Sequence, residues 1–380
     1  MIGGLFVKSS RIALVAAAGV AYSSATLKAA DLGGDCCADL EERVAELEST
    51  TARKGNRRIS LTVYGQINRA IVWHDDDNAN GHFQSRDNNG RSGTRFGFRG
   101  RANINADLTA GYRMEIGIDN SDEANDETVE YRHTMVYLQS KSLGTIKLGR
   151  TSSATDGIAE IALESAIAQY SCEELQDVIT NCNTFGIDGS REQGIHYVSP
   201  TFAGFSLSAS WFHDDSPNIK NDDGYSAALR YAGEFGAIRL AAGIGYQNKE
   251  DGSNAGDGTD TKTISGSASV MHVPTGIFLN TVYGVIDTSS DEQTAYYVSG
   301  GVKGKWLSAG STTFEVGYGA SESDNYNAEP INITAGVSQE IDSAAMDVYL
   351  IYQYNNADVM TSNAVTNETN AITAGARIKF

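Results

Sequence analysis

The segment RFGFRGR places three guanidinium groups on one side of an extended chain. Arg95, Arg99 and Arg101 share one parity while Phe96 and Phe98 share the other, so in a strand the cations and the rings face opposite ways. Arginine stays positively charged at physiological pH and binds carboxylates or phosphates through its planar fork. Such a row attracts, orients or repels charged molecules without making or breaking a bond. The chemistry that these residues suggest is therefore electrostatic.

Acidic residues gather farther along, in the stretch Thr151–Glu192. Asp156, Glu160 and Glu164 lie in its first half, where the segment IAEIALESAIAQY (158–170) has helical spacing and predicts one or two helical turns. Two interpretations are open. The stretch is either a solvated surface loop or an acidic loop that folds inward to face the arginines.

The chain shows no recognisable catalytic set. Its six histidines are scattered, and no Ser/His/Asp arrangement, phosphate-cradling glycine loop or metal-ligand spacing is visible. The aspartates in Asp75–Asp77 and Asp257–Asp260 could hold Ca²⁺ in outer loops, although short acidic runs are more often simply hydrated. We therefore expect no enzyme activity, no catalytic residue and no cofactor apart from such Ca²⁺.

The elements that must position these charges are strands. From Ile59 onward, apolar and polar residues alternate in short runs that turn residues interrupt. In GFSLSASWF, for example, Phe205, Leu207 and Trp211 alternate with serines. The pattern predicts sixteen strands, at residues 59–73, 93–104, 108–119, 131–140, 144–150, 193–199, 204–214, 224–233, 237–249, 261–272, 276–287, 294–306, 311–322, 330–340, 345–355 and 370–380.

The connections between these strands alternate in length. Short turns such as PTFA (200–203) are followed by longer polar stretches such as 74–92 and 356–369. Membrane barrels have short turns on one side and long loops on the other, and strands of about ten residues cross the hydrocarbon layer. A closed sheet also leaves no unpaired backbone groups in lipid. The sequence thus predicts an all-β fold, a 16-stranded antiparallel transmembrane β-barrel over residues 59–380.

In such a barrel the polar parity of each strand faces the lumen. Tyr64 and Gln66 then point inward from the first strand, and Arg113 and Glu115 point inward from the third. Arg69 falls on the outward parity of the first strand, which predicts a local bulge there.

The region before the strands differs from the rest. Lys8 and Arg11 precede an apolar run at Ile12–Tyr22 that is too short to span a bilayer as a helix, so residues 1–30 are predicted to be a Sec signal peptide. Residues 31–58 have apolar side chains at helical spacing, which predicts a short periplasmic helix and a linker. That helix is either loosely docked or an oligomer stem.

The four cysteines fall in the predicted exported part, where disulfides are permitted. Cys172 and Cys182 lie close together in one polar loop and are the candidate disulfide. Cys36 and Cys37 are adjacent and rarely bond to each other in this arrangement, which leaves free thiols or cross-links between chains.

The final segment ITAGARIKF keeps its alternation to the last residue. Soluble domains usually end in a frayed polar tail, whereas Ile372, Ala374, Ala376, Ile378 and Phe380 share one parity here. We expect this segment to close the barrel against the first strand, with Phe380 at the membrane–water border where aromatic girdles form.

The net charge of the chain is −19, and its basic residues are scattered. Proteins that bind nucleic acid neutralise phosphates with clustered basic residues. We therefore expect no nucleic-acid partner.

Several segments resemble the Gram-negative general porins: YGQINRA, RFGFRGRANINADLTAGYRMEI, and GTIKLGR before the long acidic stretch. The stretch DCCADLEERVAELESTTARKGNRRISLTVYGQ is similar to the alphaproteobacterial porins in particular. The resemblance extends over residues 31–380. It implies a trimeric 16-stranded barrel whose third loop folds inward and narrows each pore.

The resemblance also implies roles for individual residues. Gln66 stands where such porins often have a basic residue, and a C-terminal phenylalanine such as Phe380 is read by the outer-membrane assembly machinery. The pore constriction would have a basic wall and an acidic loop, comprising Arg95, Arg99, Arg101 and Arg132 on the wall and Asp156, Glu160 and Glu164 on the loop.

The expected function is passive diffusion of small hydrophilic solutes and ions through a water-filled channel in the outer membrane of a Gram-negative bacterium. Outer-membrane lipid and lipopolysaccharide would surround a homotrimer. The alternatives are a substrate-selective channel and a plugged barrel with an adhesin or structural role. A barrel enzyme would need a catalytic set at its rim, which the sequence does not supply.

Overall fold

The computed structural model describes residues 59–76, 79–87, 92–120, 127–167, 187–213, 223–251, 259–289, 291–324, 330–359 and 365–380. The predicted signal peptide, the predicted N-terminal helix and the four cysteines lie outside these residues. Within the described part, no helix is both long and apolar enough to cross a membrane.

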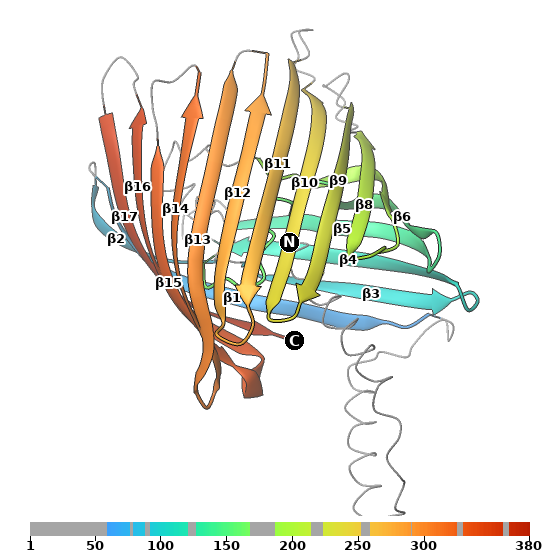
Figure 1. Ribbon diagram of the computed structural model, residues 1–380, viewed down its shortest axis with the longest axis horizontal. Helices are drawn as coiled ribbons and strands as arrows, with labels where there is room; N and C mark the ends of the chain where they lie inside the picture. Colours follow the sequence, from blue (N-terminus) through green and yellow to red (C-terminus); the bar gives the residue numbers. More distant parts are fainter. Residues whose placement is uncertain are drawn as a thin grey trace, which may run out of the picture.

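One antiparallel sheet of 17 strands makes up the structure (Figure 1). From β3 to β17 each strand pairs with the next in the sequence, and β1 pairs with β2, β3 and β17, so the sheet closes on itself. The elements are β1 (Thr62–Asp76), β2 (Ala79–Asp87), β3 (Arg95–Asn103), β4 (Leu108–Asn120), β5 (Glu127–Ser140), β6 (Gly144–Ser152), β7 (Arg191–Val198), β8 (Phe205–His213), β9 (Asp223–Phe235), β10 (Ile238–Asp251), β11 (Thr259–His272), β12 (Ile277–Asp287), β13 (Glu292–Leu307), β14 (Gly310–Ser323), β15 (Ile331–Ile341), the 3-10 turn η3 (Asp342–Ala344), β16 (Met346–Val359) and β17 (Val365–Lys379).

The barrel has sixteen strand positions because β2 and β3 share one of them. The C-terminal part of β1, from Arg69 to Asp76, pairs with β2. Its N-terminal part, from Thr62 to Gln66, pairs with β3. Both partners run antiparallel to β1. The predicted closed 16-stranded barrel is therefore confirmed, with its second strand split in two.

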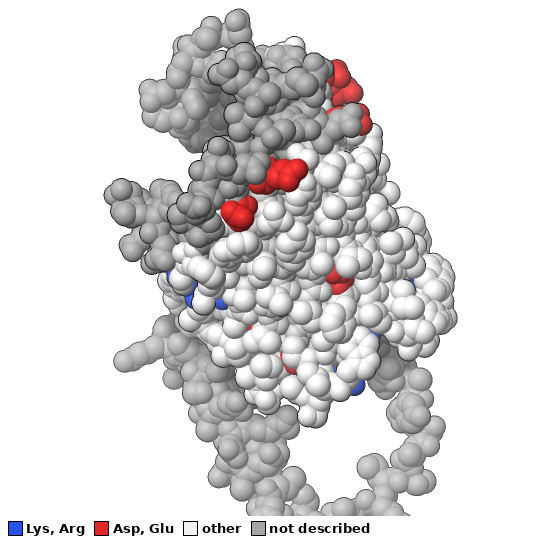
Figure 2. Space-filling model, turned by 90° about the vertical axis from the view of Figure 1, so that its left-hand side faces the viewer, with Lys and Arg blue, Asp and Glu red and all other residues white. Residues whose placement is uncertain are grey.

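Side chains alternate between two environments along the strands. From Phe205 to Phe212, β8 alternates residue by residue between exposed and buried. The exposed positions carry Leu207 and Trp211, whereas the buried positions carry serines. Figure 2 shows that the visible outer wall is mostly uncharged, with acidic side chains toward its upper half. An apolar exterior around a polar interior is the arrangement of a membrane-spanning barrel.

The barrel closes where β1 meets β17. Gly65 and Phe380 exchange two backbone hydrogen bonds of 2.9 and 3.0 Å. A Cβ atom at Gly65 would lie 2.5 Å from the ring of Phe380, so that ring occupies the space that the glycine leaves open. Ile372, Ile378 and Phe380 are all exposed, which confirms their predicted outward parity.

All sixteen predicted strands match observed strands, but the connections on the loop side are shorter than predicted. Ala79–Asp87 forms β2 inside the predicted loop 74–92, and both β16 and β17 extend into the predicted loop 356–369. Polar residues still form strands in these stretches, because pairing with a neighbouring strand gives their backbone N–H and C=O groups hydrogen-bond partners.

The bulge predicted at Arg69 is wrong. β1 and β17 pair without a register shift from Gln66 opposite Lys379 to Asp76 opposite Thr369. With regular pairing on this side, Arg69 points to the outer surface, and one of its terminal nitrogens lies 3.4 Å from the carbonyl oxygen of Ser85 on β2.

Candidate functional site

Five cations face the lumen from four adjacent strands, and we call this group the cationic wall. Antiparallel pairing of β3 with β4, β4 with β5 and β5 with β6 brings their inward side chains together on one side of the barrel. The cationic wall comprises Arg95 and Arg99 on β3, Arg113 on β4, Arg132 on β5 and Lys147 on β6.

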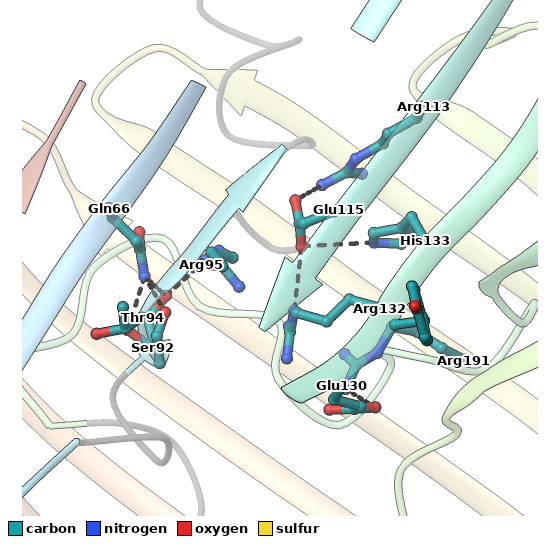
Figure 3. A network of polar contacts seen from close by, with 12 residues as sticks. Gln66, Ser92, Thr94, Arg95, Arg113, Glu115, Glu130, Arg132, His133 and Arg191 are labelled. Atoms are coloured by element: carbon teal, nitrogen blue, oxygen red, sulfur yellow. Dashed lines mark hydrogen bonds and ion pairs between the residues drawn. The ribbon is translucent and has the colours of Figure 1, made fainter. Parts of the chain in front are cut away.

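Besides Glu130 at its edge, which pairs with Arg191 at 3.7 Å, the cationic wall holds the carboxylate of Glu115 on β4 (Figure 3). It is 1% exposed, and its two oxygens lie 2.5 Å from a terminal nitrogen of Arg113 and 3.0 Å from Nε of Arg132. The hydroxyl of Tyr64 donates to Glu115 at 2.9 Å and accepts from Nε of Arg113 at 2.8 Å. Glu115 and Tyr64 therefore fix the directions of two guanidinium groups.

A β-bulge turns Arg132 and His133 to the same side. Glu115 pairs with His133 and Ile116 pairs with Tyr131, which leaves Arg132 without an opposite residue. Both consecutive side chains are buried in the lumen as a result. Strict alternation would turn one of these two side chains to the lipid. Because of the bulge, both side chains line the lumen.

The segment between β2 and β3 holds Arg95 in place. A terminal nitrogen of Arg95 donates to the hydroxyl oxygen of Ser92 at 2.7 Å, and Nε2 of Gln66 donates to the same oxygen at 2.8 Å. Gln66 also donates to the carbonyl oxygens of Ser92 and Gly93. The neutral amide can make all these contacts because it donates without adding a charge beside Arg95.

The other two predicted arginines of β3 lie nearer the turn end of the barrel. The guanidinium carbon of Arg99 is 5.2 Å from the centre of the Tyr64 ring, a cation–π arrangement. Arg101 is exposed, and its backbone pairs with Ser60. Arg95 and Arg132 thus lie close to Glu115, Arg99 lies beside this cluster, and Arg101 lies at the end of the strand. Their role at the narrowest point of a pore stays a prediction.

The long connection between β6 and β7, residues 153–190, is called the inner loop below. Its described residues contact lumen-facing side chains of successive strands from β9 to β14. The contacts join Ala154 N to Ser226 Oγ (3.2 Å), Thr155 Oγ1 to Gln247 Oε1 (2.8 Å), Ile161 N to Ser267 Oγ (3.2 Å), Leu163 N to Ser269 Oγ (3.0 Å), Glu164 O to Asn280 Nδ2 (3.1 Å), Glu164 Oε2 to Lys303 Nζ (2.9 Å) and Ser165 Oγ to Glu315 Oε2 (2.7 Å).

These contacts place residues 154–167 inside the barrel, against the wall opposite the cationic wall. The helical turns predicted from residue 158 are wrong for residues 158–167, which form turns and bends. The reason is that the backbone N–H groups of Ile161, Leu163 and Ala166 donate to side chains of the strands, whereas a helix needs them for its own carbonyl groups.

Isoleucines of the inner loop pack into spaces that glycines leave in the wall. A Cβ atom added at Gly284 would lie 2.7 Å from Cβ of Ile187, and one added at Gly243 would lie 2.5 Å from Cδ1 of Ile161. Ile187 is 1% exposed in a cluster with Ala159, Val282, Ala295 and Tyr297. Burying one isoleucine side chain stabilises by roughly 1.5–3 kcal/mol, so packing fixes the loop together with the hydrogen bonds.

Asp188 ties the two ends of the inner loop together. Its carboxylate accepts hydrogen bonds from the backbone nitrogens of Gly157 at 2.6 Å and Ala159 at 2.9 Å. Burial, followed by the nearby carboxylates of Glu160 and Asp156, raises the pKa of Asp188 well above its ordinary value.

The three predicted loop acids have different surroundings. Asp156 is buried, and its backbone oxygen accepts from Arg230 on β9 at 3.0 Å. Glu164 binds Lys303 on β13, the strand wall behind the loop, at 2.9 Å. Glu160 is partly buried and lies near Asp188. Whether any of the three faces the cationic wall across a pore stays a prediction.

Sequence reasoning missed the groups that anchor the inner loop. Glu315 accepts from the backbone nitrogens of Ala166 and Ile167, and Arg230 bridges Ser208 and the loop. Inward parity marks Glu315 and Arg230 as lumen-facing, but no local signal in the sequence pairs a strand residue with a loop residue far away in the chain. The described residues contain no group of three or more His, Cys, Asp or Glu that could hold a metal ion.

The fold is shared with solved outer-membrane channels. The anion-selective porin from Comamonas acidovorans is 16% identical, with a TM-score of 0.64 over 85% of this chain and 100% of that chain. The outer membrane channel DcaP of Acinetobacter baumannii is 13% identical, with a TM-score of 0.63 over 86% and 99%. OmpT of Vibrio cholerae, solved in a trimer form, is 14% identical, with a TM-score of 0.58 over 85% and 99%.

At the level of sequence, no curated protein matches significantly. The model of the Gram-negative porin family, however, matches residues 11–360, which is most of the chain. The closed barrel, its apolar exterior and its polar lumen agree with that match. The chain belongs to the Gram-negative porin family and is a channel of the outer membrane.

Proposed function

We propose that the barrel passes small hydrophilic solutes and ions by passive diffusion through a water-filled neck between the cationic wall and the inner loop. The observation that carries this proposal is the path of the loop, whose residues 154–167 bind the inner side chains of β9 to β14. A segment fixed on one side of the lumen narrows the passage and leaves space on the other side. The lining charges act on solutes in transit, and no bond is made or broken.

Reconstitution into liposomes and planar bilayers tests this function. We expect stepwise conductance that rises linearly with salt concentration, and entry of uncharged monosaccharides but not of large oligosaccharides. A current that saturates and is blocked by one solute would instead support a substrate-selective channel. A protein that inserts without conductance would support a plugged barrel with an adhesin or structural role.

The proposal extends to a homotrimer in which subunits meet at the outer face around Arg69. On β1, Arg69 lies four residues from Gly65, which accommodates the Phe380 ring, and four residues from Trp73. It is thus midway between two aromatic positions, which in membrane barrels mark the borders of the apolar band. A lipid-facing arginine at the midplane costs about 2–4 kcal/mol. A neighbouring subunit that covers this face would keep the charge of Arg69 away from the lipid.

Three further expectations accompany the porin function. We propose a Sec signal peptide at residues 1–30, contacts of the outer face with lipid and lipopolysaccharide, and recognition of Phe380 by the assembly machinery. The exposure of Phe380 at the end of β17 is compatible with such recognition.

A further inference from the structure

We propose that the neck of this channel favours anions, so that small carboxylates and phosphates pass more readily than cations of the same size. This inference rests on the proposed channel function and adds the class of solute. The net charge of the whole chain, −19, would suggest the opposite preference. What decides the preference is the charge beside the water path.

The cationic wall carries more positive charge than its carboxylate neutralises. Arg95, Arg113 and Arg132 all act on Glu115, which holds one negative charge. Lys147 lies near Arg113, Arg230 and the carboxylate of Asp156, and Arg99 is exposed over the ring of Tyr64. An excess of positive charge therefore remains on β3 to β6.

Three acids outside the cationic wall pair with cations. Asp347 pairs with Arg377 at 2.9 Å, and Glu164 and Glu340 share Lys303 at 2.9 and 3.1 Å. The charge of Asp347 is therefore balanced by Arg377, whereas Glu164 and Glu340 share one cation and together keep one net negative charge.

Two further acids, Glu315 and Asp156, lie away from the water, whereas Glu160 is partly exposed. Glu315 is 3% exposed, and it binds the backbone of Ala166 and Ile167 together with the hydroxyl of Ser299. Asp156 is 4% exposed at the base of the inner loop, beside Arg230. The raised pKa of Asp188 favours its neutral form. The described residues of the inner loop thus present less negative charge to the neck than their composition suggests.

The geometry makes the local excess effective. Fixed charges act without strong screening over distances shorter than the Debye length, about 8 Å at physiological ionic strength. Two excess cations at roughly 8 Å in water change the local concentration of a monovalent ion by a factor of about two to six. We expect chloride to be about threefold more permeant than potassium at 0.1 M salt.

The test is the reversal potential of the reconstituted full-length protein in a tenfold gradient of potassium chloride. The reversal potential of the wild type should have the sign that indicates chloride preference. The double variant Arg99→Gln/Lys147→Gln should shift the reversal potential toward the value expected for potassium preference. The reversal potential reports ion preference whatever the size of the conductance of the variant. Arg239→Gln is the matched control, because Arg239 pairs with Glu234 beside the turn between β9 and β10 and should leave the potential unchanged.

The outcomes separate this inference from the channel function. A conducting wild type that prefers potassium, or a double variant with the potential of the wild type, would overturn the anion preference while the channel function stands. Absence of conductance would overturn the channel function itself. As a second readout, Glu115→Gln should strengthen chloride preference, since it removes the negative charge within the cationic wall; a shift toward potassium would count against the inference.

Discussion

The Oε2 atom of Glu315 on β14 lies 2.7 Å from the backbone nitrogen of Ala166 in the inner loop. The same oxygen accepts from the hydroxyl of Ser165 and from the backbone nitrogen of Ile167. Three donors from adjacent loop residues thus converge on one carboxylate oxygen of the barrel wall. A hydrogen bond to a charged group contributes about 1.5–3 kcal/mol, so this contact is a main attachment of the loop.

Replacing that carboxylate should loosen the loop. Glu315→Gln keeps the size of the side chain but turns one acceptor into a donor that opposes the loop N–H groups. We expect larger and noisier single-channel currents in planar bilayers. Glu234→Gln serves as the control, because Glu234 binds Arg239 at the turn end of β9. Currents of wild-type size and noise in Glu315→Gln would show that other contacts suffice to hold the loop.

Two glycines of the inner wall and one of the outer face, Gly300, predict a graded series. Gly284→Ala should be the most damaging, because its new Cβ would meet Cβ of Ile187 at 2.7 Å, an atom fixed to the backbone. Gly243→Ala meets only the mobile tip of Ile161 and should be milder. Gly300→Ala should be neutral, since its nearest neighbour would lie 3.5 Å away.

Thermal unfolding in detergent and single-channel conductance check this series. Overpacking by Gly284→Ala should lower the free energy of unfolding by about 1–3 kcal/mol and change the conductance as the loop moves. Equal effects of Gly284→Ala and Gly300→Ala would mean that Ile187 does not pack as described.

Asp188 predicts a dependence of stability on pH. Because its pKa is raised on folding, the folded protein binds a proton at higher pH than the unfolded chain does, so the free energy of unfolding rises as pH falls toward the ordinary value of 3.8. Asp156, Glu160 and Arg230 are the charged groups that face it. Asp188→Asn should remove this part of the pH dependence in thermal unfolding; an unchanged profile would contradict it.

Asp107, in the turn between β3 and β4, predicts the opposite sign. A hydrogen bond from the Ser140 hydroxyl, 2.7 Å long, lowers the pKa of Asp107. Its contribution to stability is therefore present above the ordinary value of 3.8 and is lost as pH falls through the lowered pKa. Asp107→Asn in the same unfolding experiment should flatten the acid limb, and a steeper limb would refute the assignment.

The homotrimer predicts that Arg69 matters for assembly. Arg69→Leu should lower the temperature at which oligomers dissociate on semi-native gels, because the substitution removes the contacts of the guanidinium group with the next subunit. As a comparison, Leu279→Arg puts a new charge on the outer face of β12 and should destabilise the barrel by about 2–4 kcal/mol if that face meets lipid. Stabilisation by Arg69→Leu would indicate that Arg69 faces lipid as well.

The barrel could be predicted from the sequence because its signal is local. In β8, each serine that faces the lumen stands beside a residue that faces outward, so parity alone assigns both. The end of β17 follows the same rule up to Phe380. Where a stretch is polar on both parities, as in residues 79–87, the same rule finds no strand although the backbone pairs.

The candidate site was only partly predictable because its contacts join distant segments. Parity placed Arg113 and Glu115 in the lumen, but the bulge at Arg132 depends on how β5 pairs with β4. Glycine spacing gave no hint that Gly284 accommodates Ile187. The helical spacing after residue 158 reflects apolar packing against the wall, and a periodic pattern cannot distinguish that from a helix.

The seam between Gly65 and Phe380 also bears on how the barrel forms. Its hydrogen bonds join residues at opposite ends of the described chain, so the closure entropy of the whole sheet must be overcome before they form. Until then β1 and β17 each have an unpaired edge, which lipid cannot satisfy. Opening the seam therefore costs much free energy, and a barrel with an open seam is not a stable state in the membrane. The barrel should assemble and unfold as one cooperative unit.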